Sequence, residues 1–441
     1  MITREETELT RRAMQWALEK GARAARLTLT KSTENLVATL DGKIDRVTHC
    51  EDRSLSIALF AGGKFGAFST NRLSESALKD FIVKSLGILE MLAPDPYRRL
   101  PDEERYCRDA TTGLENDLYD PTYMDLTPEK RTAIALDATA FGSDPYIISE
   151  EGEWSDSEYD CLVIDSHGLE CHHSETCFDY GVEITVQTQE GDRYSGYWWN
   201  SSPYFFELNC KDCGLKALQR AKSHIGSAPE AGGKYNMVVD TEVAGKMVSP
   251  LLSALSGYAI QQKNSFLDGS LGKQVFPEGF TMNDCPHIPG QTGSKLFDSE
   301  GVATVPGPIV ENGVVKKYFL NTYMAGKLGM APTIEEATRP KVEGWPKRGL
   351  KQKDILGMCG SGILVTDFNG GNSNPATGDF SYGIEGFLFE NGEIVRPVSE
   401  MLVTGNFLTL WNNLIAAGSD ARPCMSKLIP TLAFSNVDFN G

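Results

Sequence analysis

The residue types that could perform catalysis are scattered through this chain. His172 and His173, with Cys171 and Cys177 nearby, form the one local cluster of metal-ligand types. Neighbouring side chains on an extended strand point to opposite faces, so Cys171 and His173 share a face and His172 points away. We therefore expect packing roles here and no metal site.

Two other cysteine patterns invite a chemical interpretation. Cys210 and Cys213 have the C-x-x-C spacing of redox and zinc sites, but no second ligand pair stands at zinc-ribbon or zinc-finger spacing. Cys359 lies in the glycine-rich run 357–362, and no histidine follows it, although one that precedes it could approach. A thiol nucleophile needs a partnering base to form its thiolate. We expect that Cys210 and Cys213 pack in the core. Around Cys359 we expect the glycines to allow close backbone packing.

Paired carboxylates and paired tryptophans remain. Asp298 and Glu300 are the most suggestive carboxylates, and their position in a polar turn between β segments predicts a solvated turn. Trp198 and Trp199 are adjacent on a predicted strand, which places one ring on each face, so we expect one in the core and one at an interface. The sequence contains no G-x-S-x-G elbow, no H-E-x-x-H motif, no phosphate-binding loop and no G-x-G-x-x-G that opens a helix after a strand. Nucleotide binding therefore lacks support.

Composition limits the class of protein. The 441 residues are enough for two domains, and no apolar run is long enough to span a bilayer. The charged, helix-like residues 1–6 predict no export signal and hence a cytoplasmic protein, in which we expect the ten cysteines to be reduced. The net charge of −18 disfavours direct binding of nucleic acid or of membranes. Much of that charge is local, since residues 101–160 hold 17 Asp and Glu against 4 Lys and Arg.

The elements that must position these residues follow from periodicity and turn signals. In the first half we expect an α-β-β-β-β-α order, a long surface excursion to about Leu126, and then a helix, three strands, a hairpin and a second helix. The expected helices are 5–20, 74–89, 127–140 and 210–224, and the expected strand segments are 27–29, 36–40, 44–47, 55–60, 65–68, 146–155, 159–165 and 170–188. Hairpin turns are expected at Asp41-Gly42, at 61–64 and at Gly191-Asp192.

The breaker-rich stretch 228–233 is the best domain boundary, which divides the chain into 1–228 and 229–441. The second half has one clear helix, glycine-punctuated strands and two Asn-Gly hairpin signals, at Asn312-Gly313 and Asn391-Gly392. The fold class is therefore α+β: an N-terminal two-layer domain with an antiparallel sheet, and a C-terminal, mainly-β, barrel-like domain. Expected elements of this half are the helices 242–256, 321–329 and 406–416 and the strands 309–320 and 362–368.

A family resemblance begins in this second half and covers most of residues 235–420 in order. The sequence resembles the TldD/PmbA family, and its PmbA (TldE) branch in particular. The segments that carry the resemblance are 256–260, 265–274, 297–302, 311–313, 323–329, 362–366, 377–383, 390–394, 397–400 and 404–406.

The resemblance implies a cytosolic metalloprotease assembly of two homologous chains, of which only the TldD-type chain holds zinc. The family was named for modulating DNA gyrase. The resemblance implies that this effect is indirect, through processing of peptides or of an antitoxin that act on gyrase. In the catalytic branch a His-Glu-x-x-x-His helix follows the first strand of this domain, and the matching stretch here, Lys246 to Leu255, has no His and no Glu. Pro250 within it is expected to kink the helix. Cys424 lies where the catalytic branch has a cysteine ligand, but one soft donor alone does not hold zinc.

We therefore assign no catalytic, metal or cofactor-binding residue and expect no cofactor. The first hypothesis is a non-catalytic subunit that is inactive alone, whose partner is a TldD-like zinc-bearing homologue and whose substrate is a peptide or an unfolded polypeptide. The alternatives are a self-sufficient metallo- or thiol-dependent peptidase and a homodimeric binding scaffold.

Overall fold

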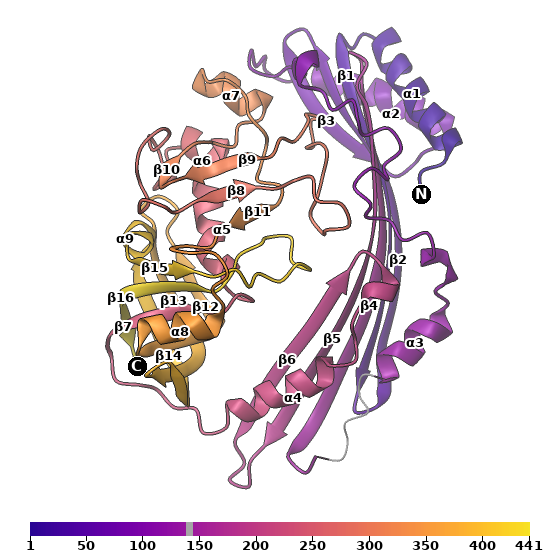
Figure 1. The fold of residues 1–441 in the computed structure, drawn as a ribbon. Coiled ribbons are helices and arrows are strands. Elements are labelled where there is room, and N and C mark those ends of the chain that lie inside the picture. Colours follow the sequence, from indigo (N-terminus) through magenta and orange to yellow (C-terminus); the bar gives the residue numbers. More distant parts are fainter. Residues whose placement is uncertain (138–143) are drawn as a thin grey trace.

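The computed structural model describes residues 1–137 and 144–441, and it contains 22% helix and 39% strand. A long curved sheet built by the first half of the chain runs the full height of the molecule, and the second half packs beside its upper part (Figure 1). The expected α+β class is confirmed, with an antiparallel sheet in the N-terminal part and a closed five-stranded barrel in the C-terminal region.

The N-terminal sheet has six strands in the order β3-β2-β1-β4-β5-β6, and every neighbouring pair is antiparallel. The predicted turn at Asp41-Gly42 joins β1 to β2 and is confirmed. The strands are β1 (Ala24–Leu40), β2 (Lys43–Ala61), β3 (Lys64–Thr70), β4 (Ile147–Asp165), β5 (Glu170–Gln187) and β6 (Arg193–Ser202).

The expected count of short strands is wrong. Segments expected to be separate, such as 146–155 and 159–165, are halves of single strands, so the chain begins α-β-β-β-α. Polar stretches such as 30–35 interrupt the hydrophobic pattern but not the pairing, because β1 is bonded to a neighbour on each side there. Backbone hydrogen bonds to two neighbours hold the strand where side-chain burial does not.

Four helices cover one face of this sheet: α1 (Arg4–Glu19), α2 (Glu75–Leu89), α3 (Pro128–Asp137) and α4 (Cys213–Ser223). Thr3 begins α1 with a reciprocal capping box to Glu6. The helices α1 and α2 pack at one end of the sheet and α3 and α4 at the other, each pair in its own hydrophobic cluster. Residues 138–140 of the helix expected over 127–140 lie outside the described residues.

The expected surface excursion before Leu126 is instead a buried cover for the other face of the sheet. Tyr106, Cys107 and Ala110 are each at most 4% exposed and pack against Val163 and Cys171. The Tyr106 hydroxyl donates a hydrogen bond to Asp165 at 2.5 Å. The segment has little periodicity because it follows the sheet surface as irregular chain, so its burial has no helical or strand signature.

The C-terminal half contains the barrel, a four-stranded sheet and five helices among its described residues. The barrel closes because β14 pairs with β16, and β7 and β12 are its one parallel pair. Its strands are β7 (Gly233–Val239), β12 (Gly362–Ser373), β13 (Asp379–Glu390), β14 (Glu393–Asn406) and β16 (Leu432–Asn440), and β15 (Leu414–Ala417) extends it. The smaller sheet has β8 (Met282–Asp284), β9 (Gly307–Glu311), β10 (Val314–Val315) and β11 (Pro340–Val342).

The helices of this half are α5 (Gly245–Ala254), α6 (Gly257–Gln261), α7 (Thr322–Leu328), α8 (Gln352–Cys359) and α9 (Phe407–Asn412). Both Asn-Gly hairpins are confirmed, since Asn312 and Asn391 each have a φ of 51°. The expected helix 406–416 ends at Asn412, where β15 follows, and the expected strand 309–320 divides into β9 and β10. The first error is a misplaced boundary, which local sequence signals fix least well, and the second is a strand that the Asn312-Gly313 turn divides.

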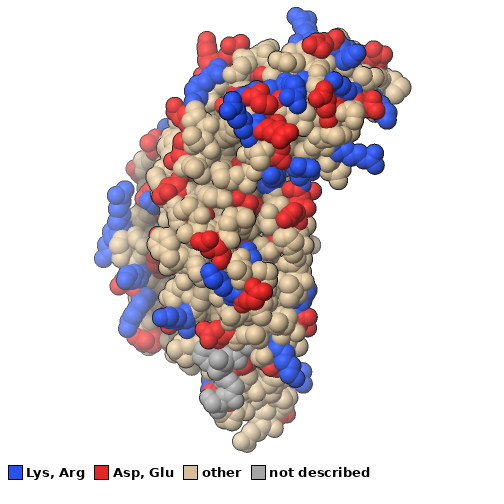
Figure 2. Space-filling model, turned by 90° about the vertical axis from the view of Figure 1, so that its right-hand side faces the viewer, with Lys and Arg blue, Asp and Glu red and all other residues tan. Residues whose placement is uncertain are grey.

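Figure 2 shows the outer side of the molecule, with α1 and α2 towards its top. Lys and Arg are mixed with Asp and Glu over this face, most densely near the top. The described part of this face therefore presents no continuous positive field of the kind that binds phosphate backbones. Within the described residues, no helix is both long and apolar enough to cross a membrane.

Candidate functional site over helix α5

The helix α5 has one side in the core and one side on an open cleft. Met247, Val248 and Leu251 are fully buried in the main hydrophobic cluster with barrel strands. Lys246, Ser249, Pro250 and Ser253 line a cleft of about 670 Å³. Spacings of three and four residues place these four side chains on one face of a helix. The helix continues past Pro250 to Ala254, although proline offers no N–H to the Lys246 carbonyl.

Aromatic rings form the facing wall of the cleft. Phe266, Phe368 and Tyr382 line it together with chain from the end of β12, and Tyr382 is 2% exposed. The Lys246 ammonium lies 4.8 Å from the centre of the Tyr382 ring. At that distance the ring face attracts the cation and restricts where the lysine side chain lies.

Glu242 also lines the cleft, and its carboxylate contacts two guanidinium groups. Arg220 of α4 lies 2.7 Å from one carboxylate oxygen, and Arg422 donates to the other at 2.8 Å. Burial raises the pKa of Glu242, and the two arginines act in the opposite direction. This arrangement joins the N-terminal sheet, the start of α5 and the loop before β16 at a single carboxylate.

The expectation for the two tryptophans is wrong in part. Trp198 and Trp199 are both half-buried, and the Arg422 guanidinium lies 4.5 Å from one ring and 4.8 Å from the other. Trp198 packs against the hydrophobic cluster under α4, and both rings also meet Arg422 from the second half at the junction. A contact between residues more than 200 positions apart has no signature in the local pattern.

Zinc, which the resemblance implies for the catalytic branch, does not fit this site. The cleft face of α5 offers an ammonium, two hydroxyls and a proline, whereas protein zinc takes thiolate, imidazole and carboxylate. Cys424 lies in the loop between β15 and β16 and is not among the described residues that line the cleft. Among residues 1–137 and 144–441, no three His, Cys, Asp or Glu are grouped to hold a metal ion.

The histidine and cysteine cluster on β5 divides between the two faces, as predicted. Cys171 is buried with Cys107 and Val163, and His173 meets the edge of the Phe297 ring. His172 contacts Glu170, which pairs with Arg11 of α1 on the helical face. Each imidazole has a carboxylate neighbour of its own, so the cluster is a set of separate packing contacts.

The expected solvated turn at Asp298 and Glu300 is wrong. Glu300 is 7% exposed, lies 3.8 Å from Arg26 of β1, and accepts a hydrogen bond from the Thr322 amide. Burial and the nearby Glu300 charge raise the pKa of Asp298 to about 7. The turn is covered because the N-terminal sheet packs over it, and Asp298 borders a 370 Å³ pocket between the two halves.

Cys210, Cys213 and Cys359 lie in packing environments. Cys213 is fully buried and Cys210 packs against the same cluster, which agrees with the packing interpretation. Burial raises the pKa of Cys359 to about 11, so its thiol stays protonated at neutral pH. A Cβ added to Gly362 would lie 2.1 Å from the Asn236 carbonyl oxygen, so the predicted close backbone approach is confirmed.

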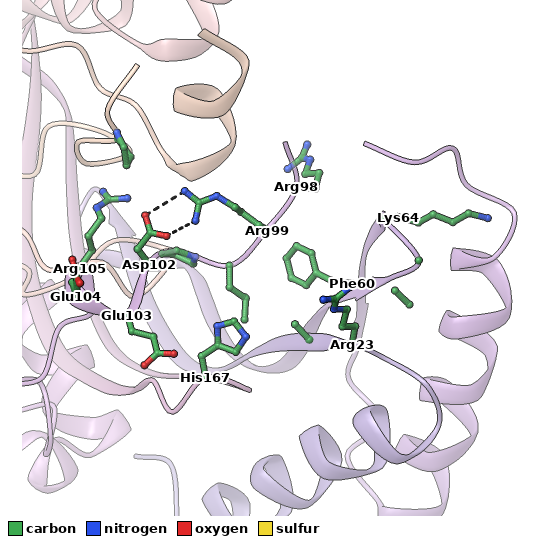
Figure 3. A pocket seen from close by; sticks show the side chains of 17 residues that line it. Arg23, Phe60, Lys64, Arg98, Arg99, Asp102, Glu103, Glu104, Arg105 and His167 are labelled. Carbon is green, nitrogen blue, oxygen red and sulfur yellow. Dashed lines mark hydrogen bonds and ion pairs between the residues drawn. The ribbon is translucent and has the colours of Figure 1, made fainter. Parts of the chain in front are cut away.

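A cavity of about 1010 Å³ lies at the other end of the molecule between the β2–β3 turn and residues 98–105 (Figure 3). Its cations are largely engaged already. Arg99 forms a two-pronged ion pair with Asp102, Arg98 stacks 3.4 Å from the Tyr323 ring, and Lys64 donates to the Glu90 carbonyl. One buried nitrogen of Arg105 has no hydrogen-bond partner among the described residues, so this cavity keeps a free donor. We take the α5 cleft as the candidate because the resemblance places the zinc helix of the catalytic branch at this helix.

Two family models match this chain. Residues 232–441 match the model for the PmbA/TldA metallopeptidase C-terminal domain, and residues 119–225 match the central domain. The metalloprotease PmbA homologue of Haemophilus influenzae is 30% identical over 435 residues, 95% of this chain and 93% of that protein. The chain belongs to the PmbA/TldD family. Metalloprotease PmbA of Escherichia coli O157:H7 is 29% identical over 419 residues, 92% of this chain and 91% of that protein.

Solved structures of the family share the whole architecture. A proposed modulator of DNA gyrase from Bacteroides thetaiotaomicron is 40% identical, with a TM-score of 0.94 and full coverage of both chains. TldE from Thermococcus kodakarensis has the same fold at 20% identity, with a TM-score of 0.83 over 98% of this chain and 100% of that chain.

Sequence reasoning identified α5 but missed its polar face. Lys246, Ser249 and Ser253 are spaced three and four residues apart, and this helical spacing could have predicted a polar, solvent-facing side of the helix. The aromatic wall and the arginines on Glu242 come from distant segments, and no local pattern indicates them.

Proposed function

We propose that this chain is the non-catalytic subunit of a cytosolic PmbA/TldD-type metalloprotease, in which a zinc-bearing homologue cleaves peptides or unfolded proteins. The observation that carries the proposal is the cleft face of α5. It bears Lys246, Ser249 and Ser253, none of which is a zinc ligand in proteins. Any effect on DNA gyrase, the property named for the Bacteroides protein, is then indirect and follows from the peptides that are processed.

The role we propose for the subunit is to complete or gate the substrate chamber. An unpaired strand edge supports this role, since β3 pairs with β2 only along residues 55–61. Among the described strands, none pairs with the outer edge of residues 43–54. An extended polypeptide can bind such an edge by main-chain hydrogen bonds.

Two alternatives lead to different measurements. The relatives from Haemophilus influenzae and Escherichia coli are named metalloproteases, which keeps a self-sufficient peptidase as the second candidate. A homodimeric binding scaffold without proteolysis is the third. Zinc content and chelator sensitivity distinguish the second candidate from the first, and partner association distinguishes the third.

The experiment is co-expression of the chain with a homologue that carries His-Glu-x-x-x-His. Peptidase activity and zinc content are measured for each chain alone and for the two together. We expect no chelator-sensitive cleavage from this chain alone and more cleavage from the pair than from the homologue alone. Unchanged activity on adding this chain, or stoichiometric zinc in this chain alone with cleavage lost to chelator, would contradict the proposal.

A further inference from the structure

The α5 cleft contains a cation without an acidic partner. Lys246 is exposed, and no described carboxylate lies within ion-pair distance of its ammonium. Its one described interaction is with the Tyr382 ring. Because no described carboxylate pairs with this ammonium and it lies in a concave site, it is available to an anionic ligand.

The two carboxylates that line the cleft differ in their surroundings. Glu242 is bound by Arg220 and Arg422, and Asp367 lines the cleft as the one further carboxylate. Since the two arginines offset the Glu242 charge, Lys246 is opposed within the lining by Asp367 alone. Such a site suits a monoanion. A phosphate dianion favours several cations or arginine forks, and Asp367 would repel it.

The uncharged part of the cleft suits an apolar group next to that anion. Phe266, Phe368 and Tyr382 supply aromatic surface, and Pro250 and Pro375 supply aliphatic surface. The hydroxyls of Ser249 and Ser253 face the same space, and neither has a hydrogen-bond partner among the described residues. A hydroxyl donates to a carboxylate oxygen as readily as to water.

We propose that this cleft binds the C-terminal residue of a peptide, with Lys246 and the α5 hydroxyls on the free α-carboxylate and the aromatic wall on an apolar side chain. A volume of about 670 Å³ accommodates more than one residue, because clefts of roughly 300–1,000 Å³ take ligands of several residues' size. This inference rests on the proposed function in one respect. It takes the ligand of the non-catalytic subunit to be a peptide and names the part of that peptide which the subunit holds.

The test uses the purified full-length chain and the probe acetyl-Gly-Gly-Gly-Phe, compared with its C-terminal amide, by calorimetry or fluorescence anisotropy. We expect the free acid to bind about tenfold more tightly than the amide, as a charge-assisted hydrogen bond contributes. In Lys246→Met this preference for the acid should fall to about one, because the cation that reads the carboxylate is gone. Ser249→Ala with Ser253→Ala should reduce the preference in part.

The matched control is Lys84→Met, an exposed lysine on α2 at the far end of the molecule. It should leave both affinities unchanged, and thermal unfolding of each variant confirms that it is folded. Equal binding of acid and amide to the wild type, or a preference that survives in Lys246→Met, would overturn the proposal. So would acetyl-phenylalanine binding as tightly as the peptide, which would indicate a small carboxylic acid as occupant. No homologue is present in this binding assay, so a negative binding result does not contradict the proposed subunit function. A negative co-expression result likewise does not contradict binding of the peptide C-terminus to the cleft.

Discussion

Arg422 and Glu242 form an ion pair of 2.8 Å at the junction of the two halves, where the arginine also lies against Trp198 and Trp199. Both charged side chains are little exposed, 12% and 11%. A pair at this depth is held by its second partners as well, since Arg422 donates to the Asn200 side chain and Glu242 receives Arg220. The position of α5 relative to the N-terminal sheet therefore depends on this contact.

Arg422→Met is expected to lower the free energy of unfolding by about 2–4 kcal/mol, because it leaves the Glu242 carboxylate buried with one cation fewer. Urea denaturation measures the change. Arg348→Met is the control, since Arg348 is 85% exposed and 3.9 Å from Glu343, and it should cost less than about 0.5 kcal/mol. Equal effects of the two substitutions would show that the junction does not depend on Arg422.

Asp298 is expected to make stability fall as pH rises. Its pKa of about 7 in the folded chain lies above the ordinary value of 3.8, so the folded state favours the protonated carboxyl. The stabilisation is complete below about pH 4 and is lost as pH rises through 7. Asp298→Asn should remove up to about 3 kcal/mol of that decline between pH 4 and pH 8, measured by urea denaturation at several pH values.

The neighbouring variant Ser299→Ala serves as the control for Asp298, because it disturbs the same turn without removing the carboxyl. It loses the hydrogen bond to Glu335 and should keep the wild-type pH profile. If Asp298→Asn and the wild type decline in parallel, the carboxyl does not titrate in this range.

Cys359 is expected to react slowly with alkylating reagents. The thiolate is the reactive species, and burial keeps this thiol protonated with a pKa of about 11. Iodoacetamide at pH 7.5 should modify exposed Cys50 well before Cys359, as followed by peptide mass spectrometry. Preferential labelling of Cys359 would revive the thiol-peptidase alternative.

Two glycines near the β12 start give a matched test of close packing. Gly362→Ala places a Cβ 2.1 Å from the Asn236 carbonyl oxygen and should cost about 1–3 kcal/mol through forced backbone movement. Gly357→Ala, inside α8 with open space around the added methyl, should stabilise by about 0.5–1 kcal/mol. Thermal or urea unfolding distinguishes them, and a neutral Gly362→Ala would mean that β7 and β12 can separate without loss.

Local chemistry made part of this structure predictable. The Asn312-Gly313 and Asn391-Gly392 hairpins followed from residues that tolerate a positive φ, and α5 followed from its apolar period. The length of the strands could not be predicted from the sequence, because the polar middle of β1 is held by backbone hydrogen bonds to β2 and β4. The cover over Glu300 and the arginines on Glu242 come from the other half of the chain, and a local pattern contains no information on them.

During synthesis the barrel can close only after its last strand, β16, has been made. β7 pairs with β12 on one side and with β16 on the other, and β16 begins about 200 residues later. At roughly 5–20 residues per second, a ribosome needs on the order of 10–40 s to supply that last partner. Throughout that interval Met237, Val238 and Val239 lack the neighbours that bury them in the finished protein. The nascent chain is therefore most exposed to chaperones, and most prone to misassembly, after its N-terminal sheet has formed and before β16 emerges.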